Sequence, residues 1–315
     1  MSRSSRSMID CVYVAASALD ARFTRTCVAS VRSFYPEIPI RLLVGGRLQR
    51  RLEHELRRHW GIRIADFPQG DYGWGFVKLE PLFGTPGERF LILDSDTVLT
   101  GPVLDDWKGS DAPFLVDNEK YSEEQTKVYY DWRRVREIDP TTQRPLFLFN
   151  TGQWLGTSGV LHRDDFAPWI EWTFPRKARH PECFFNGEQG ILNYVLNQKA
   201  LLGGLRVECR AIMRWPGKGL QGLEARAIAE RTAASVIIHW AGMGRVRQRH
   251  VVGADVLAYF EEIYYERLPF GRARRIVATW QNSLTNWLDG VRVRVRLRLR
   301  MIADTPLVKR PLRAK

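Results

Sequence analysis

The stretch Phe90-Leu91-Ile92-Leu93-Asp94-Ser95-Asp96 decides the fold class. Its four apolar residues predict a short buried strand, and two carboxylates, Asp94 and Asp96, follow directly where that strand ends. Ligands of open α/β sheets bind at the carboxyl ends of the strands. The sequence therefore predicts a binding site at Asp94, Ser95 and Asp96. A surface turn is the plainer alternative, because Asp and Ser also favour turns.

The residues before this stretch alternate between strand and helix patterns. We expect strands at 9–16, 38–44 and 62–65, and helices at 21–34, at 48–60 and, limited by Pro81, at 77–83. This alternation is typical of an α/β fold with a mixed, mostly parallel sheet flanked by helices.

The residues after this stretch are less regular. We expect a helical insertion at 121–138, strands at 146–150, 154–161, 207–209 and 236–239, and helices at 166–174 and 189–197. Residues 70–76, Gly-Asp-Tyr-Gly-Trp-Gly-Phe, combine glycines with aromatic side chains. We interpret this segment as an aromatic plug over the core, and a mobile loop that stacks on a sugar or base is the alternative.

The composition is that of a soluble globular protein. Of 315 residues, 44% are hydrophobic and 26% charged, and no run of about 18 apolar residues predicts a transmembrane helix. Arg3 and Arg6 precede an apolar stretch, as in a signal peptide, but Asp10 interrupts it, so we interpret this stretch as the first strand. The four cysteines form no CxxC pair, which predicts reduced residues of a cytosolic protein rather than a zinc site.

A histidine completes the predicted site. His239 ends an apolar segment at 235–239. An imidazole beside two carboxylates gives a mixed nitrogen and oxygen site that suits Mn²⁺ and tolerates Mg²⁺. We therefore predict that Asp94, Asp96 and His239 hold a metal ion, which would offset the charge of a nucleotide diphosphate. A packed core histidine is the alternative interpretation.

Several short segments resemble glycosyltransferases of the GT-A fold, especially glycosyltransferase family 8 and its bacterial relatives. The resemblance spans roughly residues 9–247, and its motifs occur in the family's order. They are Lys78-Leu79, the Asp-x-Asp segment at 90–103, Phe149-Asn150-Thr151-Gly152, Glu188-Gln189-Gly190-Ile191-Leu192-Asn193 and Ile238-His239-Trp240-Ala241-Gly242.

The resemblance implies a metal-dependent, retaining hexosyltransferase that uses a nucleotide-diphospho-sugar, with UDP as the family's usual nucleotide. It implies catalytic or sugar-facing roles for Lys78, Asn150, Glu188 and Gln189. The nucleotide-sugar donor would be bound by Tyr13, Ala15, Ser17, Arg22, Lys78, Asp94, Ser95, Asp96, Gly242 and Arg245.

The chain also departs from the family pattern. Glu188 stands where the family has Asp, and Arg245 stands where it has Lys, without the Pro-Trp that follows there. The family's Thr-Asn-Asp turn is not visible at 15–22.

The positive charge is concentrated at the C-terminal end. Residues 272–315 contain twelve Lys or Arg and two Asp or Glu, so they carry +10 of the net charge of +13. We expect a glycosyltransferase domain at 1–270 and a basic amphipathic tail at 271–315. In the tail, Val or Leu alternates with Arg at 291–300.

The basic tail has three interpretations: attachment to an anionic membrane through 272–300, nucleic-acid binding, or a protected edge strand. We favour the membrane, because no aromatic residue is interleaved at 291–300 for stacking on bases. We expect a cytoplasmic protein, peripheral on the inner face of the membrane, that acts on a glycan or a lipid-linked acceptor. The insertion at 118–146 would contribute to the acceptor pocket.

Two other functions compete. A haloacid-dehalogenase-like phosphatase would use Asp94 as nucleophile and Asp96 as acid and base, since its signature is an apolar strand followed by the same carboxylate spacing. That fold normally opens with this strand, whereas here two or three strand–helix units precede it. A non-enzymatic membrane- or nucleic-acid-binding module would depend on the tail and not on Asp94 and Asp96.

Overall fold

The strand that ends in Asp94 lies at the centre of the fold. A computed structural model describes residues 9–280 apart from 19, 74, 120–121 and 243–250, and structural statements below refer to those residues. Strand β4 (Arg89–Asp94) is the fourth of seven strands, in the order β10-β6-β7-β4-β1-β2-β3. The others are β1 (Cys11–Ala16), β2 (Ile40–Val44), β3 (Arg63–Ile64), β6 (Phe114–Asp117), β7 (Gln153–Thr157) and β10 (Val207–Arg210).

The sheet is parallel except at one strand. β4, β1, β2 and β3 are parallel to one another, and β10 is parallel to β6, whereas β7 is antiparallel to both β4 and β6. This arrangement confirms the predicted mixed, mostly parallel sheet. Helices cover both faces, which explains why β1 and β4 are apolar at nearly every position.

Alternating side chains of β1 and β4 enter two cores on opposite faces of the sheet. The first core lies on the face covered by α1 (Ala21–Phe34), α2 (Arg50–Trp60) and α8 (Ala254–Glu266), and the second on the face covered by η1 (Phe76–Phe83) and α6 (Glu188–Gly203). The first core contains Val12, Val14, Leu91 and Leu93, and the second contains Cys11, Tyr13, Phe90 and Ile92.

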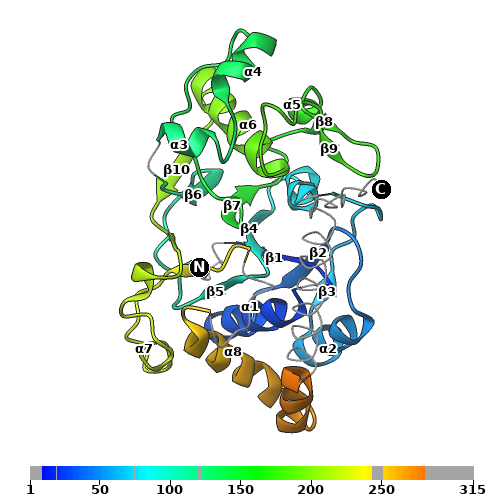
Figure 1. The fold of residues 1–315 in the computed structure, drawn as a ribbon, viewed down its shortest axis with the longest axis vertical. Coiled ribbons are helices and arrows are strands. Elements are labelled where there is room, and N and C mark those ends of the chain that lie inside the picture. The colour runs from blue at the N-terminus through cyan, green and yellow to red at the C-terminus, as the bar shows by residue number, and fades with distance from the viewer. Residues whose placement is uncertain (1–8, 19, 74, 120–121, 243–250, 281–315) are drawn as a thin grey trace, which may run out of the picture.

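Helices α1 and α8 pack side by side along the lower face of the sheet in Figure 1. A buried charge network joins them to α2, because Arg25 of α1 donates to Glu55 of α2 and Tyr264 of α8 also donates to Glu55. A helix at 271–280 follows α8, and Arg275 of this helix contacts Glu262 and the carbonyl of Ala258. No described helix combines the length and the hydropathy needed to cross a bilayer.

A second, small sheet stands at the carboxyl end of β4. It consists of β11 (Met213–Arg214), β12 (Ile237–His239) and β5 (Thr97–Leu99), in that order. β5 follows β4 after a two-residue turn and pairs antiparallel with β12, so that His239 lies opposite Thr97. This pairing brings the end of β12 to Asp94 and Asp96.

The regular elements of the first part match their predictions within two residues at most ends. The described aromatic side chains of the segment at 70–76 form the expected plug over the core, because Tyr72 and Phe76 are both buried. Trp74 lies outside the described residues. Three cysteines are buried, Cys209 is half-buried, and all four are free thiols.

The second part contains the wrong predictions. The expected strand at 146–150 is not a strand, because amides of α6 bind its backbone: Asn193 pairs with both backbone groups of Phe149, and Asn197 does the same for Phe147. The strand expected at 154–161 is the shorter β7, whereas the remaining strands and α6 occur as predicted with shifted ends.

The expected helix at 166–174 is also wrong. The short helix α5 (Arg163–Phe166) is followed by a hairpin of β8 (Ile170–Glu171) and β9 (Lys177–Ala178). The insertion at 121–138 is not one helix but two short ones, α3 (Glu123–Thr126) and α4 (Trp132–Ile138). The remaining elements are η2 (Lys218–Leu220) and α7 (Ala225–Ala229).

Candidate metal and nucleotide-sugar site

Three potential metal ligands converge at the carboxyl end of β4. Asp94, Asp96 and His239 each offer one ligand atom, and these atoms lie within 4.8 Å of one another. The Nε2 atom of His239 is 3.2 Å from an Asp96 carboxylate oxygen and 3.9 Å from one of Asp94. His239 is 2% exposed, whereas both aspartates are partly exposed, so a cation could reach the triad from the solvent side.

The backbone fixes the positions of the three side chains. The amide of Asp94 donates to the carbonyl of Gly152, and the amide of Trp240 donates to the carbonyl of Asp96. The hydroxyl of Thr97 donates to the carbonyl of Asp94, which closes the turn between β4 and β5. The triad is therefore held by paired backbone on each side rather than by a free loop.

Gly152 makes room for the histidine. A Cβ atom built at position 152 would overlap the imidazole carbon Cε1 of His239, and it would lie 2.8 Å from Nδ1. The glycine of the Phe149-Asn150-Thr151-Gly152 motif thus has a physical reason, since any side chain there would displace the ring. Nδ1 itself is buried and has no hydrogen-bond partner among the described residues.

The aspartate that faces the histidine has a shifted acidity. Burial acts to raise the pKa of Asp96, but the hydrogen bond and the charge of His239 outweigh it and hold this pKa below its ordinary value. Asp96 is thus a carboxylate at neutral pH. Two carboxylates and one imidazole form a donor set that suits Mn²⁺ and accepts Mg²⁺.

A buried lysine ties the triad to helix α6. Lys78 of η1 is 6% exposed, and its Nζ atom lies 3.1 Å from an oxygen of Asp94 and 2.7 Å from an oxygen of Glu188. Burial alone would lower the pKa of Lys78, but the two carboxylates outweigh it and raise this pKa. Lys78 is therefore a permanent cation between two anions.

Glu188 is the most enclosed of the predicted catalytic residues, with 1% of its surface exposed. Burial raises the pKa of Glu188, and the nearby charge of Lys78 offsets this only in part. One carboxylate oxygen accepts from the hydroxyl of Thr151, and the other has no partner among the described residues. A Cβ atom at Gly75 would overlap this second oxygen, and Gly75 has a positive φ that also favours glycine.

Gln189 and Asn150 also lie in this cluster. The side-chain oxygen of Gln189 accepts from the backbone amide of Thr151, and that of Asn150 accepts from the amide of Gly152. The structure thus brings together Lys78, Asp94, Asn150, Glu188 and Gln189. Thr151, which contacts three of them, was not predicted.

The predicted donor-binding residues of the first strand are more dispersed. Ala15 lies at the site, because its carbonyl accepts from the amide of Ser95. The Tyr13 hydroxyl donates to Glu88, which precedes β4. This hydroxyl therefore lies at the opposite end of β4 from Asp94. The Ser17 hydroxyl donates to Asp20, and Arg22 forms two hydrogen bonds with Glu261 of α8.

The segment after His239 is only partly described. Gly242 is exposed and has a positive φ, and Arg245 lies outside the described residues. Trp215 was not among the predicted site residues, but its ring stacks on that of His239 with 5.3 Å between ring centroids. Its signal would have been the register of β11 beside β12, which residue patterns do not reveal.

Comparison with solved structures identifies the architecture. The galactosyltransferase LgtC, in complex with donor and acceptor sugar analogues, matches with a TM-score of 0.51 and 16% identity over 81% of this chain and 95% of LgtC. The bifunctional glycosyltransferase WbbM matches with a TM-score of 0.52 and 15% identity over 84% of this chain and half of WbbM. The chain has the GT-A fold.

Other comparisons delimit this result. The glycosyltransferase GlyE of Streptococcus pneumoniae TIGR4 matches with a TM-score of 0.50 and 14% identity, over 82% of this chain and 62% of GlyE. No family model and no curated protein matches the sequence.

In this GT-A fold the strand that carries Asp94 is fourth in the chain, which excludes the fold of the haloacid-dehalogenase-like phosphatases that opens with that strand.

Proposed function

We propose that this chain is a metal-dependent glycosyltransferase that moves a hexose from a nucleotide-diphospho-sugar to a glycan or lipid-linked acceptor. One observation carries the proposal: Asp94, Asp96 and His239 converge at the carboxyl end of the central strand of a GT-A fold. We propose UDP as the nucleotide and retention of the anomeric configuration, both because of the resemblance to family 8.

Asp94, Asp96 and His239 would hold Mn²⁺ or Mg²⁺, which offsets the negative charge of the diphosphate when it is bound. The chain's own residues would bind and orient the rest of the donor. Ser95 and Ala15 lie beside the triad, and Arg245 would add a cation for the diphosphate. Tyr13, Ser17, Arg22 and Gly242 remain predicted donor residues.

The cluster around Lys78 would face the transferred sugar. Lys78 fixes Asp94 and Glu188 relative to each other, so it would set the geometry between the metal and the sugar. Glu188, Gln189 and Asn150 would orient sugar hydroxyls. One solved structure of LgtC is of an active-site mutant with a glutamine replaced by glutamate, which supports a catalytic role for Gln189 by analogy.

The test is hydrolysis of UDP-glucose, UDP-galactose and UDP-N-acetylglucosamine with Mn²⁺, in which water replaces the sugar acceptor, takes the hexose and releases UDP. Asp96→Asn should lower this turnover by about 100-fold or more, because a metal ligand and its charge are lost. Asp106→Asn removes the same charge from an exposed position and should change nothing. Equal turnover in both variants would reject the metal site, and no turnover in the native chain would favour a binding module without catalysis.

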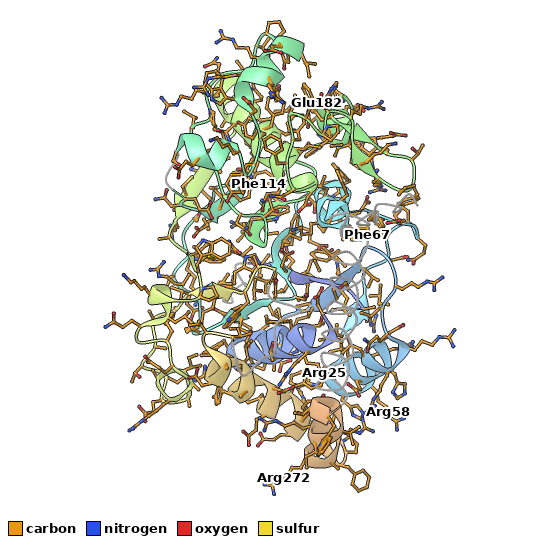
Figure 2. All side chains as sticks on the ribbon, in the orientation of Figure 1. Arg25, Arg58, Phe67, Phe114, Glu182 and Arg272 are labelled. Atoms are coloured by element: carbon orange, nitrogen blue, oxygen red, sulfur yellow. The ribbon has the colours of Figure 1, made fainter. Side chains whose placement is uncertain are left out.

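We also propose that the C-terminal region attaches the protein to an anionic membrane surface. Phe270 is 85% exposed just before the helix at 271–280. On that helix Trp280 is 74% exposed, and Ile276 is exposed as well. Arg272 lies at the lower end of the molecule in Figure 2, far from Glu182 at the upper end. An apolar face beside arginines is typical of helices that lie in a membrane interface. The stripe at 291–300 lies outside the described residues.

Sedimentation with vesicles tests the membrane proposal. The protein should bind vesicles that contain phosphatidylglycerol and not vesicles of phosphatidylcholine alone, and salt should weaken the binding. A Phe270→Ser and Trp280→Ser double variant should lose binding, whereas Leu202→Ser, exposed on α6, should retain it. Equal binding to both vesicle types, or no loss in the double variant, would reject this attachment.

A further inference from the structure

Trp215 is an exposed aromatic side chain in direct contact with the candidate metal histidine. It follows β11, which runs parallel to β12 with Met213 opposite Ile237 and Arg214 opposite Ile238. Continuing this register by one residue puts Trp215 beside His239. The two rings are stacked, with an angle of 21° between their planes.

The two stacked rings differ sharply in their exposure. His239 is 2% exposed, whereas Trp215 is 43% exposed. The imidazole covers part of the indole ring, and solvent reaches the rest. A large aromatic surface open to solvent at the rim of a polar site is the usual composition of a ligand pocket, where apolar faces bind and a few polar groups orient the ligand.

The topology shows on which side of the metal triad Trp215 lies. The carboxylate of Asp117, the last residue of β6, accepts from the backbone amides of Ile212 and Met213. These bonds fix β11 at the end of β6, which β7 separates from β4, whereas β1 and β2 lie on the other side of β4. In doubly wound sheets the nucleotide binds near the first strands. Trp215 thus lies on the side away from the predicted nucleotide residues at β1.

Glu119 adds a polar group on this same side. It follows β6 by two residues and accepts from the hydroxyl of Tyr129. Glu119 and β11 thus both lie at the carboxyl end of β6, so the acidic group could bind hydroxyl groups of a sugar whose apolar face rests on the indole.

We propose that Trp215 is the platform on which a pyranose ring of the acceptor stacks, beside the metal triad. A pyranose presents several C–H groups on one face, and the indole ring offers a flat apolar surface of similar size. This inference rests on the proposed glycosyltransferase function and deepens it, because it assigns the acceptor side of the site and the chemical class that binds there.

The test uses the full chain with all 11 tryptophans replaced by 5-fluorotryptophan and observed by fluorine NMR. Trp215→Phe and Trp280→Phe assign the two signals. Methyl glycosides of glucose, galactose, mannose and N-acetylglucosamine are added to about 100 mM, because single sugars bind proteins weakly. At least one should shift the Trp215 signal and leave the exposed control Trp280 unchanged.

Three outcomes would overturn the proposal: no shift with any of the four glycosides, equal shifts of Trp215 and Trp280, or a Trp215 shift with UDP and Mn²⁺ but not with sugars. The last would assign the ring to the nucleotide base. Failure of the proposed function is distinguishable, because it would appear as the absence of any nucleotide binding while the sugar response of Trp215 stays measurable.

Substitution separates stacking from a merely structural role. In ligand-observed NMR, saturation transfer from the protein to the methyl glycoside that responds should fall about tenfold in Trp215→Ala, the loss expected for one aromatic contact, and Trp215→Phe should restore most of it. Affinity for UDP with Mn²⁺ should stay unchanged in both variants. A loss of metal-dependent nucleotide affinity in Trp215→Ala would instead show that the ring only supports His239, and it would contradict the platform.

Discussion

The two sides of the central strand β4 are built differently. On one side β1, β2 and β3 form a parallel half, in which strand ladders satisfy the backbone. On the other side β7, β6 and β10 form a mixed half, in which single side chains do much of this work: Asn193 and Asn197 bind the segment at 146–149, and Asp117 binds the start of β11. The mixed half should therefore be more sensitive to single substitutions.

The carboxyl groups of the triad and of the mixed half also differ in acidity. In the triad, His239 holds the pKa of Asp96 down, whereas in the mixed half burial raises the pKa of Asp117 and of Glu119. A carboxylate kept ionised suits a cation, and a carboxyl group that resists ionisation suits hydrogen bonding to a neutral ligand.

The largest expected effect is at Lys78, which joins the two halves. Lys78→Met should lower the free energy of unfolding by about 3–5 kcal/mol, because it leaves Glu188 buried without its cation. Urea unfolding measures the change. Adding Glu188→Gln to this variant should recover part of the loss, since the unpaired charge is removed. A double variant as unstable as the single one would contradict the charge-pair explanation.

A smaller effect is expected where an amide replaces a strand. Asn193→Ala should cost about 2 kcal/mol, because both backbone groups of Phe149 lose a buried partner. The control is Ser33→Ala in α1, whose hydroxyl donates within its own helix and whose loss should cost under about 0.5 kcal/mol. Equal losses, again from urea unfolding, would mean that the mixed half is no more sensitive than the parallel half.

The smallest effect is a pH dependence at Asp117. Native Asp117 binds its proton more tightly than the unfolded chain does, so its contribution to stability is greatest when protonated and falls as the pH rises from 3.8 through the raised native pKa. Asp117→Asn keeps an acceptor for Ile212 and Met213 without a charge. Its stability relative to the native chain should rise over this window by on the order of 1 kcal/mol. A difference that does not change with pH would contradict the assigned shift.

The parallel half could be predicted from the sequence because its signals are local. Apolar runs give β1 and β4, and α1 has the predicted bounds of 21–34 because its apolar spacing is regular and Pro36 lies just beyond it. The convergence of Asp94, Asp96 and His239 was predicted too, although His239 is distant in sequence, because the segment at 238–242 resembles a motif of the glycosyltransferase family.

The mixed half could not be predicted in the same way, because its structure depends on contacts between distant residues. The segment at 146–149 has the apolar residues of a strand, but its partners are side chains 44 and 50 positions away. The hairpin of β8 and β9 replaces an expected helix, and Arg176, in the connection between these two strands, pairs with the buried Glu80. Nothing in the local spacing indicates such partners, nor the stacking of Trp215 on His239.

The central claim is that Asp94, Asp96 and His239 form the metal site of a nucleotide-sugar enzyme. The most direct measurement is thermal unfolding with UDP, GDP, CMP and dTDP, each with and without Mn²⁺, for the native chain and for Asp96→Asn. A nucleotide at about 100 times its dissociation constant adds 2.7 kcal/mol, which is a readily measured shift. We expect a shift with UDP that requires Mn²⁺ and disappears in Asp96→Asn. A folded protein that responds to no nucleotide, or equally with and without the metal, would contradict the claim.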